Sequence, residues 1–130
     1  MGNELIQKKT DAISVIENHE LGDILKPLIS EIYLFDSFIA GTTHLEDTSV
    51  VGQVQVGDSL VLRREDNKYD ENAILILNGD DKKLGYVPEK DNIVFARLMD
   101  AGKILKAKVT EIEQIGTFTK IGVGIYLVDL

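Results

Sequence analysis

The chain has 130 residues, 44% of them hydrophobic, which suits one domain with a core but not a core domain plus a motor domain. Its 14 Lys and Arg against 22 Asp and Glu give a net charge of −8, which argues against strong non-specific binding to long duplex DNA, because such binding depends on phosphate neutralisation. The lack of cysteine excludes disulfides and thiolate zinc sites, and two histidines make a weak ligand set, so we expect no metal and no other cofactor.

Residues 1–33 are expected to form a helical N-terminal extension. One helix is predicted over 4–18 and another over 21–32, where apolar residues recur at helical spacing. These helices either pack on the following domain or offer residues 5–32 for self-association or a protein partner. No basic segment leads into an apolar run, and no stretch approaches the length that spans a bilayer, so we expect a cytoplasmic protein without a membrane segment.

Short β-strands are predicted in the middle of the chain. A strand over 33–40 ends at Gly41, and an exposed loop over 44–48 follows, in which His44 is expected to be solvated or to act as a cap. Leu60 and Leu62 alternate with Val61 and Arg63, the pattern of a strand with one solvated face. The run from Asn72 to Leu77 is apolar on both faces and is typical of a central buried strand. A turn over 78–81 then leads into a strand over 84–87.

A helix of about a dozen residues is predicted after Pro88, ending at Gly102. Its inward residues are expected to be Ile93, Phe95 or Ala96, Leu98 and Met99. Alternating apolar residues predict two further strands, around 105–109 and 121–127. About six antiparallel strands with one inserted helix predict a small OB-like β-barrel over residues 34–130, closed or partly open, in a mainly β chain with helices.

Residues 66–72 form a polar loop between two apolar runs, but they do not suit catalysis. Asp70 and Glu71 are adjacent, so in an extended segment they point to opposite sides and cannot act as an acid and base across one bond. The loop lacks the glycine and the distal glutamate of a calcium-binding loop. The chain has no phosphate-binding glycine loop, no nucleophile elbow and no cysteine nucleophile. We therefore expect a protein that is not an enzyme and holds no metal.

The same loop suits recognition of a nucleic-acid end. Unpaired bases stack on aromatic faces, and four aromatic residues lie on or beside the loops and exposed strand faces of the expected barrel. These are Phe38, Tyr69, Tyr86 and Phe118, of which Phe38 and Phe118 could equally belong to the core.

Asp70 also fits a strand end, provided that it faces a donor. A carboxylate repels phosphate but accepts a hydrogen bond from a hydroxyl group, such as a free sugar 3′-hydroxyl. The alternative is that Asp70, Asn67 and Asn72 bond to the backbone of their own loop.

A family resemblance lies on these residues and covers about Phe35 to Val128. The motif Asp66-Asn67-x-Tyr69-Asp70-x-Asn72-Ala73-Ile74 follows Leu60-x-Leu62-x-Arg64-Glu65 and precedes Gly85-Tyr86-Val87-Pro88 and Phe95-Ala96-x-Leu98-Met99-x-x-Gly102. This pattern resembles the HIRAN domain. The resemblance implies an OB-like barrel that captures the 3′ end of single-stranded DNA, as HIRAN domains do in fork-remodelling ATPases.

The resemblance also implies roles for individual residues. Tyr69 and Phe38 would stack on bases, Asp70 would accept the 3′-hydroxyl, and Asn67 would make a polar contact close by. The wall of the pocket would include Tyr86 and Phe118.

Three positions depart from the pattern of DNA-binding relatives. This chain has Ser37 in place of an arginine, Asp66 in place of an amide, and Glu89 in place of a lysine, with Lys90 next to it as a substitute. Each lost cation weakens phosphate contacts, and each added carboxylate opposes them. The sequence favours a non-catalytic module that binds single-stranded DNA with a free 3′-hydroxyl, in DNA repair or replication-fork processing. The alternative is a protein–protein interaction module that has lost the DNA site.

Overall fold

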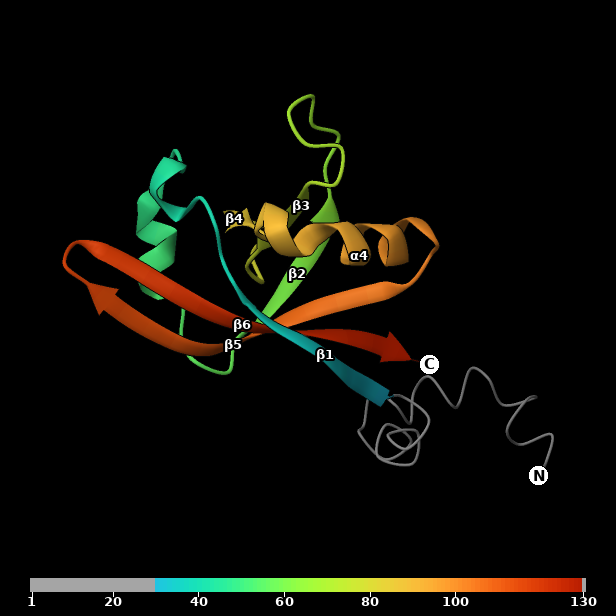
Figure 1. Ribbon diagram of the computed structural model, residues 1–130. Coiled ribbons are helices and arrows are strands. Elements are labelled where there is room, and N and C mark those ends of the chain that lie inside the picture. Colours follow the sequence, from blue (N-terminus) through green and yellow to red (C-terminus); the bar gives the residue numbers. More distant parts are fainter. Residues whose placement is uncertain (1–29, 130) are drawn as a thin grey trace, which may run out of the picture. The chain divides into compact units, whose positions relative to one another are not determined.

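The computed structural model describes residues 30–129 of the chain. Six strands, one α-helix and two short 3-10 helices follow one another there, and the predicted mainly β fold of six strands with one inserted helix is confirmed (Figure 1). In chain order they are β1 (Ser30–Phe38), η2 (Thr42–His44), η3 (Thr48–Gln53), β2 (Ser59–Arg64), β3 (Ile74–Leu77), β4 (Lys83–Tyr86), α4 (Glu89–Asp100), β5 (Ile104–Ile115) and β6 (Phe118–Asp129).

Strand β1 begins earlier than expected. The predicted helix over 4–18 and most of that over 21–32 lie outside the described residues, but residues 30–32 belong to β1, so the helix prediction is wrong there. Contacts across the sheet explain the strand: Glu31 bonds to Lys106 and Lys108 of β5, and the Tyr33 ring lies 5.7 Å from that of Tyr126 on β6. Such tertiary contacts override a helical sequence pattern. The predicted boundary between residues 33 and 34 falls inside β1.

The six strands form one sheet in the order β1-β6-β5-β2-β3-β4, which curls until its two outer strands meet. Just after β1, Ala40 pairs with Tyr86 of β4 through two backbone hydrogen bonds of 2.8 Å. The preceding residue, Ile39, bonds to Ile121 of β6 instead. The chain therefore passes from one edge of the sheet to the other at Ile39 and Ala40.

The core lies inside this curl. Most of its members are aliphatic residues on the strands, and they alternate along β2, β5 and β6 as predicted. The largest fully buried side chains are Ile39, Ile74, Ile76, Leu84, Ile121, Val123 and Ile125.

Helix α4 buries Phe95 and Ala96 on the core, as predicted. The expectation for Ile93 was wrong, because its side chain is 51% exposed and the inward position one residue earlier is taken by Asn92. The helix ends at Asp100, and Gly102 follows it in the terminating position expected for a glycine. Its φ of 93° is left-handed, and its N–H donates to the Met99 carbonyl. Between residues 30 and 129, no helix has the length and apolar character needed to cross a bilayer.

We predict that Gly85→Ala destabilises the protein strongly. Gly85 has a φ of 154°, and an added Cβ would lie 2.2 Å from the Ala40 carbonyl oxygen and 2.7 Å from Cγ2 of Ile39. Relief of this overlap would open the junction between β1 and β4. We expect a loss of more than about 2 kcal/mol in the free energy of unfolding, measured by urea denaturation.

The matched control is Gly79→Ala in the turn between β3 and β4, where an added Cβ meets nothing within 4 Å. An equal loss in both variants would contradict the steric explanation.

We predict that Glu31→Gln makes stability less dependent on acid pH. The hydrogen bonds from Lys106 and Lys108 hold the pKa of the Glu31 carboxyl below its ordinary value. A lowered pKa adds stability above the pKa of the unfolded chain, and this stability is lost as the pH falls through the folded value. The variant should therefore be less stable than wild type near neutral pH. The difference should begin to shrink as the pH falls below about 4.3, the ordinary value for Glu, and should vanish once the pH is below the lowered pKa of Glu31.

Urea denaturation across this pH range measures the difference, with the exposed Glu46→Gln as control. A gap between wild type and Glu31→Gln that stays constant with pH would count against the ion pairs.

Candidate nucleic-acid interface

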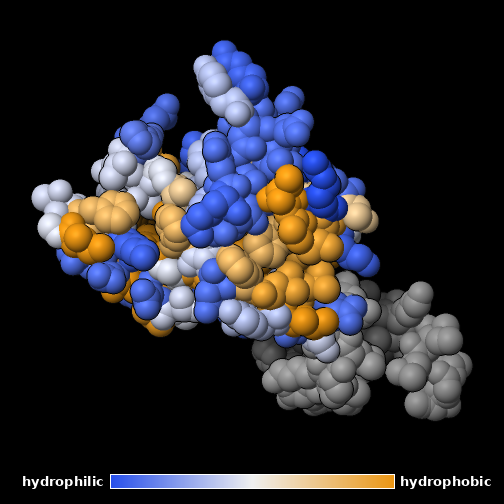
Figure 2. Space-filling model, in the orientation of Figure 1, coloured by the Kyte–Doolittle hydropathy of each residue, from blue (hydrophilic) through white to orange (hydrophobic). Residues whose placement is uncertain are grey.

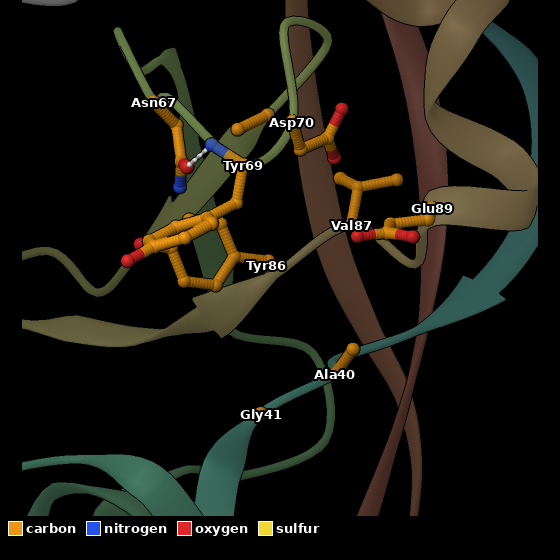
Figure 3. A pocket seen from close by; sticks show the side chains of 9 residues that line it. Ala40, Gly41, Asn67, Tyr69, Asp70, Tyr86, Val87 and Glu89 are labelled. Atoms are coloured by element: carbon orange, nitrogen blue, oxygen red, sulfur yellow. Dashed lines mark hydrogen bonds between the residues drawn. The ribbon is translucent and has the colours of Figure 1, made fainter.

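A pocket of about 260 Å³ lies beside the junction of β1 and β4. Figure 3 shows Asn67, Tyr69 and Tyr86 toward one end of it and Asp70, Val87 and Glu89 toward the other. Its walls come from the chain after β1, the loop between β2 and β3, the end of β4 and the start of α4. The lining residues are Ala40, Gly41, Asn67, Tyr69, Asp70, Ala73, Tyr86, Val87 and Glu89.

The loop over residues 66–72 is shaped by its own side chains. Asn67 Oδ1 accepts a hydrogen bond of 2.8 Å from the backbone N–H of Tyr69, and Asp70 Oδ1 accepts one of 2.9 Å from that of Asn72. The alternative that Asn67 and Asp70 bond to their own loop is thus what the structure shows. Asn72 differs, since its Oδ1 accepts from Arg97 of α4 at 3.0 Å. The loop presents Tyr69 with 84% of its side chain exposed.

Arg64 fastens the base of this loop to the helix. Its guanidinium donates to the carbonyl oxygens of Ala73 at 2.6 Å and Glu71 at 2.8 Å, and to Asp100 of α4 at 2.9 Å. The hydrogen bond to Asp100 raises the pKa of Arg64 and lowers the pKa of the Asp100 carboxyl. One cation therefore satisfies two loop carbonyls and one helix carboxylate.

Asp70 lines the pocket with a carboxylate that two donors orient. Besides the Asn72 N–H on Oδ1, the Nδ2 of Asn92 donates to Oδ2 at 2.8 Å. Both donors are uncharged amides, so they fix the carboxylate without neutralising it. A carboxylate has about four acceptor positions, which leaves capacity for a further donor such as a hydroxyl.

The two tyrosines of the pocket lie next to lysines. Lys68 lies 5.0 Å from the centroid of the Tyr69 ring, and Lys83 lies 4.5 Å from that of Tyr86 and donates to its hydroxyl at 3.0 Å. The Tyr86 hydroxyl in turn donates to Glu65 Oε2 at 2.7 Å, the same atom that accepts from Asn67 Nδ2 at 3.0 Å. Two lysines and the Glu65 carboxylate thus lie beside the aromatic side of the pocket, while Asp70 and Glu89 make the other side acidic.

The structure brings together four of the seven predicted site residues, namely Asn67, Tyr69, Asp70 and Tyr86. Phe38 and Lys90 lie together but outside the pocket lining: the ammonium of Lys90 is 5.7 Å from the centroid of the half-buried Phe38 ring. Phe118 begins β6 and lines a separate hollow beside η2 and η3. It therefore does not form part of the wall of this pocket.

The three residues that depart from the family pattern lie at different places in the structure. The hydroxyl of Ser37 donates to Asp91 at 2.8 Å and so ties β1 to α4, where relatives would present an arginine. Lys90 also donates to Asp91, at 3.1 Å, while Glu89 lines the pocket and Asp66 is exposed on the loop. The acidic side of the pocket is thus more acidic than the family pattern implies.

Sequence reasoning missed several residues that shape the site. Glu65 accepts a hydrogen bond from the Tyr86 hydroxyl, and Lys83 donates one to it. Lys120, like the predicted Lys90, lies close to the Phe38 ring, with its ammonium 5.6 Å from the ring centroid. Asn92 carried a usable signal, because it lies three and four residues before Phe95 and Ala96, on the inward stripe of the helix. Among the described residues, no three metal-ligating side chains gather in a way that could hold an ion.

Comparison with known proteins agrees with this architecture. A crystal structure of a protein from Lactobacillus plantarum superposes with a TM-score of 0.73 at 27% identity, covering 78% of this chain and 99% of that one. The HIRAN domain of human HLTF superposes with TM-scores of 0.62 for a crystal structure at 16% identity and 0.54 for an NMR structure at 18% identity. The two coverages are 78% and 76% of this chain and 79% of each HLTF chain.

No curated protein sequence matches the chain closely enough to serve as a relative. The likeness to the HLTF domain, at these identities, supports the fold alone. The family model described as HIRAN domain matches residues 32–127, which is most of the chain. This chain therefore belongs to the HIRAN domain family.

Proposed function

We propose that this chain is a non-catalytic module that binds the 3′ end of single-stranded DNA in the pocket around Tyr69 and Asp70. The observation that carries the proposal is the presence, in one small pocket, of an aromatic side chain that is 84% exposed and a carboxylate that is held in place by two neutral donors. The first suits stacking with an unpaired base, and the second suits acceptance of a hydroxyl proton.

The charges in the pocket favour an end over the interior of a strand. Asp70 and Glu89 oppose any phosphate that enters beside them, whereas a free 3′-hydroxyl brings a donor and no charge. Phosphates that lie further out can meet lysines at the pocket rim, since Lys68 and Lys83 lie over the two tyrosine rings. An acidic protein can thus bind DNA through a local site, without the broad basic surface that duplex binding requires.

Lys90, Phe38 and Lys120 form a second group of aromatic and cationic side chains, at the start of α4, the end of β1 and the start of β6. Phe38 lies two residues before Ala40 and Lys90 lies one residue after Glu89, and both Ala40 and Glu89 line the pocket. In this proposal the group contacts the nucleotides that precede the terminal one. Free 3′ ends arise in DNA repair and at replication forks, which is the setting that the family resemblance implies.

A second candidate is a protein-interaction module. One observation favours it: an apolar groove of about 410 Å³ runs between β1 and α4 and includes the exposed Phe35, Ile93 and Val94. Figure 2 shows hydrophobic side chains gathered on this face of the molecule, whereas the projecting loop is hydrophilic. The groove lies apart from the pocket lining, so both functions could belong to one chain.

We predict that the wild type binds a short single strand with a free 3′-hydroxyl more tightly than the same strand with a 3′-phosphate. The preference should fall about tenfold or more in Asp70→Ala, because a hydrogen bond to a charged acceptor contributes roughly 1.5–3 kcal/mol. Fluorescence anisotropy at low salt measures both affinities.

Asp66→Ala is the matched control, because it removes one carboxylate from the same loop outside the pocket lining. Binding that ignores the end group in wild type would refute end capture, and an absence of binding would favour the protein-interaction module.

We predict that Tyr69→Ala weakens binding of the 3′-hydroxyl strand by about fivefold to a hundredfold, because base stacking on an aromatic side chain contributes roughly 1–3 kcal/mol. Tyr69→Phe keeps the ring and should bind within about twofold of wild type. Anisotropy titrations give both values, with the exposed Tyr33→Ala on β1 as control. Equal losses in Tyr69→Phe and Tyr69→Ala would show that the hydroxyl, and not stacking, is what matters.

A further inference from the structure

Helix α4 holds the recognition loop through one face. Asn92 donates to the Asp70 carboxylate at 2.8 Å, and Arg97 donates to Oδ1 of Asn72 at 3.0 Å. Asp100 accepts from Arg64, the residue that bonds to the loop carbonyls. Residues 92, 97 and 100 thus contact three different residues of the segment from 64 to 73. The position of the helix therefore fixes the geometry of the loop.

Asn92 differs from the other two because it is buried. Its exposed fraction is 2%, and it lies on the stripe that also buries Phe95 and Ala96. A polar side chain at such a position requires hydrogen-bond partners, and Asp70 is one. Because Asn92 is buried, its amide has little room to move. The bond to Asp70 is therefore made by a rigid donor.

The Asp70 carboxylate has one donor on each oxygen, and only one of the two comes from its own loop. Without Asn92, only the Asn72 N–H on Oδ1 would hold the carboxylate. The carboxylate would then rotate more freely, that single hydrogen bond would break more often, and the acceptor positions of Oδ2 would move. A carboxylate in a varying orientation still repels phosphate, but it loses much of its ability to accept a hydrogen bond from a fixed hydroxyl.

We propose that Asn92 is a positioning residue that sets the preference for a free 3′-hydroxyl by fixing the orientation of Asp70. This inference rests on the proposed function and adds that the end preference depends on a buried residue of α4 as well as on the loop. An amide suits this position because it orients the carboxylate and leaves its negative charge in place. A lysine there would form an ion pair and reduce the repulsion of a terminal phosphate.

The test compares Asn92→Ala and Asn92→Leu with wild type. The leucine has the same branched shape and number of side-chain heavy atoms as asparagine but no donor, so it fills the space and removes the hydrogen bond to Asp70. Anisotropy gives the ratio of affinities for 3′-hydroxyl and 3′-phosphate strands. We expect the ratio to fall about fivefold or more in both variants, while affinity for the 3′-phosphate strand changes less than about twofold.

Val94→Ala is the control, because Val94 is 60% exposed on the same helix. A ratio that stays at the wild-type value in both Asn92 variants would overturn the inference. So would an equal loss of affinity for both strands, since that pattern indicates a role in folding alone. A mild effect of Asn92→Leu beside a severe effect of Asn92→Ala would also overturn it, because packing would then explain the result.

A second measurement separates this inference from the proposed function. The Asn72 N–H is bonded to Asp70, so its hydrogen exchange, followed by NMR without DNA, reports whether the carboxylate stays in place. We expect faster exchange in both Asn92 variants and wild-type exchange in Val94→Ala. If wild type shows no preference between the 3′-hydroxyl and 3′-phosphate strands, the proposed function fails. If hydrogen exchange at Asn72 is the same in wild type and in the Asn92 variants, the positioning role of Asn92 fails, whatever the DNA measurements show.

Discussion

The pairing of Ala40 with Tyr86 is the interaction on which the rest of this structure depends. Two backbone hydrogen bonds there join the chain just after β1 to β4. Gly85 allows this close approach, because a Cβ at that position would overlap the Ala40 carbonyl. The same closure creates the pocket, since Ala40, Gly41, Tyr86 and Val87 all line it. The position of the pocket therefore follows from the curvature of the sheet. Backbone pairing between Ala40 and Tyr86 fixes the inner side of the pocket, whereas the loop over 66–72 forms its outer wall.

That outer wall is held by polar contacts rather than by apolar packing. Asn67 and Asp70 fold the loop on itself, Arg64 bonds to its carbonyls, and α4 supplies Asn92 and Arg97. Such an arrangement lets a short hydrophilic segment keep one geometry while its central aromatic ring stays in solvent. The protein has a net charge of −8, but single charged side chains at fixed positions, and not the net charge, determine the electrostatics of the pocket.

Much of the fold could be predicted from the sequence. Alternating apolar residues indicated β2, β5 and β6, and Gly102 indicated the end of α4, because these signals are local. The start of β1 was missed because Glu31 and Tyr33 are held by partners on distant strands. The loop motif identified Asn67, Tyr69 and Asp70, which lie together through local bonds. It could not place Phe118, whose position depends on how far the hairpin of β5 and β6 extends, or show that Asn92 reaches across to Asp70.

The placement of the tyrosines gives this chain a natural optical reporter. The protein contains no tryptophan, so its ultraviolet emission comes from four tyrosines alone. Two of them, Tyr69 and Tyr86, lie in the pocket, while Tyr33 and Tyr126 pack against each other on β1 and β6. Stacking of a nucleobase on a phenol ring quenches its fluorescence. Occupancy of the pocket by a base should therefore be detectable in the unlabelled protein as a partial loss of tyrosine emission, because Tyr33 and Tyr126 lie outside the pocket and continue to emit.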